Sequence, residues 1–149
     1  MKGIGKQFKE IADELNTEVL KATQKATKSG IEHSLKLVKE RSPRDADRKK
    51  SRVGKPRYGS GWRIKEEPLR GFVFHNIVHN VNDPTLTHLL EDGHVLFLYG
   101  RPTGKRTRSF PHIRNSELDG FEKMEKELER ELKNIWKIPW KYLKTLNSG

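Results

Sequence analysis

The sequence predicts an α+β fold, in which a small antiparallel β-sheet packs against a long N-terminal helix and a C-terminal helix. Three observations support this prediction. Apolar residues recur at helical spacing near the start of the chain, and they do so again near its end. Between these two segments the pattern changes to a period of two residues, which is typical of strands. The 149 residues suit a single domain, residues 1–149.

Residues 1–41 are predicted to form a long helix. From Ile4 to Ala26 the apolar side chains follow one another at gaps of three or four residues, so they form one stripe. The stripe slips in phase near Gly30, where glycine favours a kink because it costs about 1 kcal/mol in a helix interior. Pro43 ends the helix. At about 1.5 Å per residue the helix is on the order of 55 Å long, and we expect its surplus stripe to pack on a neighbouring copy.

Residues 42–57 are predicted to form a basic, mobile loop. From Arg41 to Arg57 the chain holds eight basic and two acidic residues and a single aliphatic side chain larger than alanine, so no apolar face is available for burial. The basic residues of this loop that we select as DNA-facing or partner-facing are Arg44, Arg48, Lys49, Lys50, Arg52, Lys55 and Arg57.

Residues 58–114 are predicted to form the sheet. Alternating polarity over residues 62–66 and again over residues 72–78 predicts an antiparallel hairpin, and the apolar run 95–99 predicts a third strand. Residues 110–113 are expected to return to the core as a strand edge.

A short helix is predicted within this region, over residues 85–92. Leu86, Leu89 and Leu90 share one helical face, and Gly93 follows as a stop. Residues 100–109 are then expected to form a second basic loop. Its DNA-facing or partner-facing candidates are Arg101, Lys105, Arg106 and Arg108.

Residues 116–147 are predicted to form a C-terminal helix followed by an aromatic tail. Ser116 and Asp119 resemble a capping box, in which each side chain satisfies a backbone N–H of the first turn. The apolar residues from Leu118 to Ile135 follow at gaps of three or four residues, and Pro139 ends the helix.

The composition predicts a thin core and a charged partner. Hydrophobic residues make up 32% of the chain, below the roughly 45–50% of typical domains, so we expect further apolar surface to be buried against another subunit. The net charge of +11 indicates nucleic acid, an acidic membrane surface or an acidic protein as partner. The absence of cysteine excludes a disulfide framework and a thiolate nucleophile. No run of about 20 apolar residues and no signal peptide is present, so we expect no membrane-spanning segment. In the structural role that we prefer below, no membrane is expected among the partners.

Three histidines and a carboxylate of the middle region could bind zinc: His88, His94, His112 and Glu91. However, helical two-histidine sites usually place their ligands four residues apart, whereas His88 and His94 are six apart. We therefore prefer a structural interpretation, in which His88 pairs with Glu91 while His94 and His112 pack near Gly93. We expect no metal and no cofactor.

Two other functions remain open from the residues alone. His88 and Glu91 could act as a general acid–base pair in a small basic ribonuclease. Alternatively, the chain could be a non-enzymatic nucleic-acid-binding module whose basic loops contact phosphate. We favour neither, and we expect no enzymatic activity. Tyr58 and Trp62 are interpreted as core anchors at the start of the hairpin, and His75 and His79 as surface residues without a nearby acid.

Three islands of the sequence carry a family resemblance. They are Tyr58-Gly59-Ser60-Gly61-Trp62, Leu86-Thr87-His88-Leu89-Leu90-Glu91-Asp92-Gly93-His94 and Pro111-His112-Ile113, and they follow Ser42-Pro43 in the chain. In this order they resemble the gene-product-ten-like family of tailed bacteriophages, and the second island is the most specific match. The residues that we select as its structural signature are Tyr58, Trp62, Asn80, Leu86, His88, Leu89, Leu90, Glu91, Gly93, His94, Pro111 and His112.

The resemblance implies a structural role at the head–tail interface. Members of this family are small head–tail joining or tail-completion proteins, made in the bacterial cytoplasm and incorporated into the neck of the virion. They form a homo-oligomeric ring, six-fold in the virion, between the head connector and the tail-tube or tail-terminator proteins. In such a ring the basic loops would lie near passing DNA. The chain departs from the family pattern at Arg114-Asn115, where the family has Pro-Ala.

Overall fold

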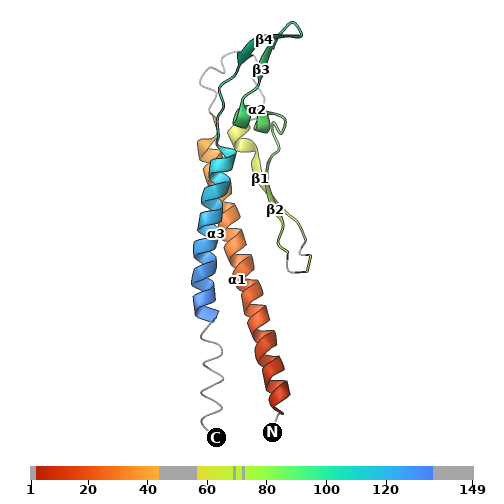
Figure 1. Ribbon diagram of the computed structural model, residues 1–149, viewed down its shortest axis with the longest axis vertical. Helices are drawn as coiled ribbons and strands as arrows, with labels where there is room; N and C mark the ends of the chain where they lie inside the picture. Colours follow the sequence, from red (N-terminus) through yellow and green to blue (C-terminus); the bar gives the residue numbers. More distant parts are fainter. Residues whose placement is uncertain (1–2, 44–56, 69, 72, 136–149) are drawn as a thin grey trace.

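The computed structural model describes residues 3–43, 57–68, 70–71 and 73–135, and it confirms the α+β class. This part of the chain has two small antiparallel sheets of two strands each, of which the first lies beside a pair of long helices and the second lies beyond one end of that pair (Figure 1). The elements are α1 (Ile4–Arg41), a 3-10 turn η1 (Tyr58–Gly61), β1 (Trp62–Glu66), β2 (Asn76–Asn80), α2 (Leu86–Asp92), β3 (Val95–Leu98), β4 (Arg101–Arg106) and α3 (Ile113–Ile135).

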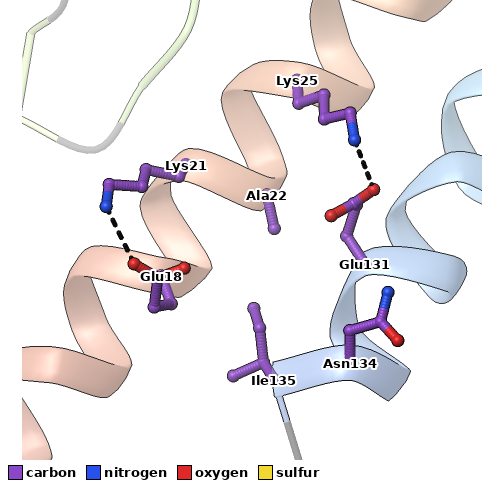
Figure 2. A pocket seen from close by; sticks show the side chains of 7 residues that line it. All are labelled: Glu18, Lys21, Ala22, Lys25, Glu131, Asn134 and Ile135. Carbon is purple, nitrogen blue, oxygen red and sulfur yellow. Dashed lines mark hydrogen bonds and ion pairs between the residues drawn. The ribbon is translucent and has the colours of Figure 1, made fainter.

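Helices α1 and α3 form an antiparallel pair that runs along the long axis of the molecule (Figure 1). Figure 2 shows one section of their interface, where Lys25 of α1 reaches Glu131 of α3 and the side chains of Ala22 and Ile135 lie between the helices. The Lys25 Nζ–Glu131 Oε1 distance is 2.7 Å. Near the other end of α3, Arg41 pairs with Asp119 at 2.5 Å. Exposed pairs of this kind contribute at most about 1 kcal/mol each, so close packing must supply most of the stability.

Glycines allow the two helices to approach closely at one point of their interface. A Cβ atom added to Gly30 would lie 2.8 Å from the carbonyl oxygen of Gly120 and 2.8 Å from Cβ of Met124. A Cβ atom added to Gly120 would collide with Ser34 Oγ and lie 2.9 Å from the carbonyl oxygen of Gly30. Helix α1 continues as one helix through Gly30. The slip in its apolar stripe therefore coincides with a packing contact.

This contact gives a prediction with a matched control. Alanine at Gly30 or Gly120 should lower the free energy of unfolding by about 1–3 kcal/mol, because overpacking outweighs the roughly 1 kcal/mol gained in helix propensity. Gly5 lies in the first turn of α1 with no atom within 4 Å of its added Cβ, so Gly5→Ala should be neutral or stabilising by up to about 1 kcal/mol. Urea unfolding monitored by circular dichroism would measure all three variants. Equal stabilisation by Gly120→Ala and Gly5→Ala would rule out this packing.

The first hairpin, β1–β2, confirms the predicted strand over residues 62–66. Trp62 lies opposite Asn80 and Glu66 lies opposite Asn76. The second predicted strand, 72–78, was wrong in its bounds, because β2 occupies Asn76–Asn80. The connection between the two strands is therefore longer than the predicted strand bounds imply, and it contains an isolated bridge between Arg70 and Val73.

The second hairpin, β3–β4, was only half predicted. The strand expected over residues 95–99 is present as β3, but the expected basic loop over 100–109 was wrong, because Arg101–Arg106 pairs with β3 as strand β4. Positive φ angles at Tyr99 (50°) and Gly100 (77°) form the turn that reverses the chain. All six residues of β4 are exposed, so the strand has no apolar alternation by which the sequence could signal it.

The last two predictions about elements need correction in part. Helix α2 and its stop at Gly93 (φ 68°) are confirmed. Residues 110–113 form no strand edge, because α3 already begins at Ile113, before the predicted capping box. Residues 136–147 of the predicted tail lie outside the described residues.

The core is small and lies at one end of the helix pair. Val38, Tyr58 and Trp62 are its buried apolar residues. The partly buried residues that pack against them are Leu35, Val78, Leu86, Leu90 and Ile113. In the first half of α1, by contrast, Ile4 is 73% exposed and Phe8 is 68% exposed. Within the described ranges, no helix combines the length and apolar character that a membrane crossing requires.

Candidate functional site

Three aromatic rings from two islands of the sequence meet in the core. Tyr58, Trp62 and His112 stack edge to face, with ring centroids 5.6 Å apart for Tyr58 and Trp62, 5.7 Å for Tyr58 and His112, and 6.1 Å for Trp62 and His112. All three side chains are buried. We call these rings the aromatic junction. Edge-to-face pairs are worth roughly 0.5–1.5 kcal/mol each beyond their buried area.

Hydrogen bonds connect the aromatic junction to the end of α1. The indole Nε1–H of Trp62 donates to Ser42 Oγ at 2.8 Å, and the Ser42 hydroxyl donates to the carbonyl oxygen of Val38 at 2.6 Å. Ser42 thus satisfies a terminal carbonyl of α1 and the buried indole at the same time. In the sequence Ser42 belongs to the Ser42-Pro43 pair that precedes the three islands, and its position directly after a long helix is the signal for this role.

The Tyr58 hydroxyl donates to Nε2 of His112 at 3.0 Å, and Nδ1–H of His112 donates to the carbonyl oxygen of Phe110 at 2.6 Å. This assignment follows from the partners, because a carbonyl oxygen can only accept. Burial raises the pKa of Tyr58, and the negative charges of Glu91 and Asp83 raise it further. The phenol therefore stays protonated and remains a hydrogen-bond donor.

Glu91 of α2 caps helix α3. Its Oε2 accepts from the backbone N–H groups of His112 and Ile113, both at 2.9 Å, and its Oε1 accepts from that of Arg114, also at 2.9 Å. These groups have no acceptor within the helix, and the helix dipole favours an anion at this end. The predicted capping box was wrong, since Ser116 is buried within α3 and donates to the carbonyl oxygen of His112.

The predicted pair of His88 and Glu91 was also wrong. His88 is exposed on α2 and makes no hydrogen bond or ion pair with any described residue, while Glu91 turns to α3. Among residues 3–43, 57–68, 70–71 and 73–135, no group of three or more His, Cys, Asp or Glu side chains could hold a metal ion.

His94 and Gly93 connect α2 to the second hairpin. The backbone N–H of His94 donates to Thr107 Oγ1 at 2.9 Å, and Thr107 N–H donates to the carbonyl oxygen of His94 at 2.8 Å. A Cβ atom at Gly93 would lie 2.7 Å from the carbonyl oxygen of Thr107, so only glycine fits there. Both His94 and Gly93 therefore contact Thr107, and no pattern in the sequence indicated this contact.

Asn80 connects the first hairpin to the turn η1. Its Nδ2 donates to the carbonyl oxygen of Tyr58 at 2.8 Å, and its Oδ1 accepts from the N–H groups of Asn82 and Asp83 at 3.0 Å. The remaining signature residues take minor places. Leu86 and Leu90 pack on the core, Leu89 is half-buried, and Pro111 is exposed.

His75 and His79 differ from expectation. His75 lies before β2, not on the predicted strand, and its Nδ1 is 2.8 Å from Glu67 Oε2, so an acid is nearby after all. This hydrogen bond lowers the pKa of Glu67. His79 is half-buried on β2, and its Nδ1 has no hydrogen-bond partner among the described residues.

The basic residues are placed only in part. Arg57 is exposed beside η1, and Arg101, Lys105 and Arg106 are exposed along β4. The guanidinium of Arg108 lies 5.7 Å from the ring centroid of Phe110. The remaining candidates, which lie outside the described residues, are Arg44, Arg48, Lys49, Lys50, Arg52 and Lys55.

The β3–β4 hairpin also exposes apolar side chains. The apolar run 95–99 predicts a strand but does not indicate that its side chains are exposed. Leu96, Phe97, Leu98 and Tyr99 are all exposed, and Tyr99 reaches 96%. The hairpin projects from the end of the molecule opposite the start of α1 and the end of α3 (Figure 1). The surface of this hairpin therefore combines apolar and positively charged groups. Among the described residues, its strands pair only with each other.

A groove of about 570 Å³ lies between the helix pair and the first hairpin. It is lined by Trp62 and Val38 of the core, by Val78 of β2 and by Met124 and Phe121 of α3. Glu117 is the one acidic residue among its described lining residues, and none of these is a lysine or arginine. The groove is lined mainly by apolar side chains, and sequence periodicity alone did not indicate it.

Comparison of the chain with models of protein families, with curated proteins and with solved structures found no match. The family resemblance therefore depends on the residues quoted above. The structure brings the three islands of that resemblance together at the aromatic junction and at the Glu91 cap.

Proposed function

We propose that this chain is a structural subunit of the head–tail interface of a tailed bacteriophage. In this proposal, copies assemble into a ring in the neck of the virion and join the head connector to the tail-tube or tail-terminator proteins. The resemblance of the three islands supports the phage assignment. The distribution of apolar residues supports assembly.

That distribution is the observation on which the proposal mainly depends. Five apolar residues of the described chain are buried, whereas twelve large hydrophobic residues are exposed. Most of the exposed residues gather in three places, which are the first half of α1, the β3–β4 hairpin and the face of α3 that carries Leu118 and Phe121. Large exposed apolar patches mark interaction surfaces in soluble proteins. A subunit whose neighbours cover such patches accounts for both the thin core and the exposed residues.

The positive charge fits the same proposal. Exposed Arg57, Arg101 and Lys105 are available to face DNA or a partner protein, and contacts with phosphate would need no base-specific geometry. The proposal includes no chemical step. Glu91 uses both carboxylate oxygens to cap α3, so it is a poor partner for His88 in acid–base catalysis.

The test is the native mass of the purified full-length chain, with and without added phage tails that lack this component. We expect a homo-oligomer, or a monomer that joins the tails. In parallel, RNA degradation by the wild type and by His88→Ala should be equally absent. A chain that stays monomeric alone and with tails would contradict the assembly role, and RNA cleavage lost in His88→Ala would establish the ribonuclease instead.

A further inference from the structure

We propose that the β3–β4 hairpin of one copy docks in the groove between the helix pair and the first hairpin of the next copy. This inference rests on the proposed function, since it names the two surfaces through which the copies would join. It commits to a second copy of this chain as the occupant of the groove.

The hairpin has the form of an inserting element. Its strands pair only with each other among the described residues, and its turn lies at the end of the molecule far from the start of α1 and the end of α3 (Figure 1). Phe97 is 64% exposed and Leu98 is 60% exposed. An isolated two-stranded hairpin is marginally stable in water, so apolar side chains at its end favour a partner that covers them.

The groove is chemically matched to this hairpin. The rings and aliphatic chains along it come from Trp62, Phe74, Val78 and Phe121, and its size suits several inserted side chains. Beyond its edge, Leu118 is exposed on the same side of α3 as Phe121 and extends the apolar surface. Burial of the hairpin end against this surface would remove apolar groups of both copies from water.

The distribution of charge favours contact between a hairpin and a groove over contact between two hairpins. The chain has 31 lysine and arginine residues against 20 acidic ones, yet its groove is lined by no described lysine or arginine. Glu117 lines the groove without an ion pair or hydrogen bond to another described side chain. The hairpin, by contrast, presents Arg101, Lys105 and Arg106. Two hairpins placed together would bring like charges into contact, whereas a hairpin in the groove brings positive charge to a carboxylate.

The geometry of such a contact leads to assembly. Hairpin and groove are different surfaces of one chain, so after the first contact each copy keeps one of the two free. Contacts between unlike surfaces generate closed rings when the rotation between copies closes, and filaments when it does not. The proposed contact is therefore of the kind that a ring subunit needs.

The absence of cysteine from the chain allows a direct test. Tyr99→Cys and Glu117→Cys are prepared separately, mixed, and oxidised at a fixed concentration in the absence of nucleic acid. We expect a disulfide-linked dimer that contains one copy of each variant. The matched control mixes Tyr99→Cys with Lys133→Cys, because Lys133 is exposed on the opposite face of α3 from Glu117. That control mixture should give at least tenfold less product.

The outcomes separate this inference from the proposed function. Suppose that the wild-type chain oligomerises but the disulfide between the Tyr99→Cys and Glu117→Cys variants forms no faster than in the control mixture. This result overturns the proposed contact between hairpin and groove, and it leaves the proposed ring assembly standing. A predominant disulfide between two copies of the Tyr99→Cys variant would also overturn it, because it indicates a symmetric contact of hairpins. As a second measurement, Phe97→Asp with Leu98→Asp should weaken oligomer formation at least tenfold, with the unfolding transition of the monomer unchanged. Unaltered assembly of this variant counts against the inference.

Discussion

Replacement of Trp62 by alanine is expected to lower the free energy of unfolding by about 4 kcal/mol. Trp62 is 2% exposed and lies at the centre of the core, against Tyr58 and His112. Its removal loses the favourable free energy of burying a large ring away from water. It also leaves a cavity, which the few side chains of the thin core cannot fill. Urea unfolding at a fixed protein concentration, monitored by far-ultraviolet circular dichroism, would measure the loss.

Two control variants separate the ring from its hydrogen bond. Trp62→Phe keeps an aromatic ring but removes the donor to Ser42 Oγ, and we expect a loss of about 1–2 kcal/mol. Tyr99→Ala removes an aromatic side chain that is 96% exposed, and it should change monomer stability by less than about 0.5 kcal/mol. If Trp62→Ala is as harmless as Tyr99→Ala, the aromatic junction is not the core of this protein.

Glu91→Ala is expected to be the next most damaging single change, with a loss of about 3 kcal/mol. The variant leaves the backbone N–H groups of Ile113 and Arg114 without their acceptors, while that of His112 keeps the carbonyl oxygen of Phe110 at 2.8 Å. It also removes the anion that complements the helix dipole. It also releases α2 from α3. Hydrogen exchange of the amides of residues 112–114 would locate the effect, and urea unfolding would give its size.

The neighbouring acid provides the control for this variant. Asp92 is exposed at the end of α2 and has no hydrogen bond or ion pair with the described residues, so Asp92→Ala should stay within about 0.5 kcal/mol of the wild type. Glu91→Gln should fall between the two, because an amide oxygen can accept but carries no charge. Equal stability of Glu91→Ala and Asp92→Ala would show that the cap does not hold α3.

The histidines of the middle region illustrate how far spacing can mislead. His88 and Glu91 are one turn apart, and the sequence therefore favoured a pair on the surface of α2. Instead, Glu91 points to a helix that begins 22 positions later in the chain, at Ile113, and His88 is left exposed. A surface pair stabilises a helix by only a few tenths of a kcal/mol. The main-chain N–H groups at the start of α3 require hydrogen-bond acceptors, and supplying them stabilises the protein more than that pair would.

Periodicity predicted the elements that bury one face. The apolar residues of α1 from Ala22 onward, the alternation of β1 and the leucines of α2 lie on faces that pack against the rest of the molecule, and each predicted element is present. Strand β4 has no buried face, so its residues carried only the signature of a charged loop. The start of α3 was missed for a related reason, because its cap comes from α2 and not from its own first turn.

The sequence by itself determined the fold class, the long helix, the stop at Gly93 and the three islands, because these depend on local backbone preference and on one-sided burial. Only the tertiary structure decided that Glu91 caps α3, that Gly30 meets Gly120, and that the β3–β4 hairpin and the groove lie on separate surfaces. These features arise from contacts between residues far apart in the chain. Such contacts depend on how whole elements pack, and no local pattern encodes them.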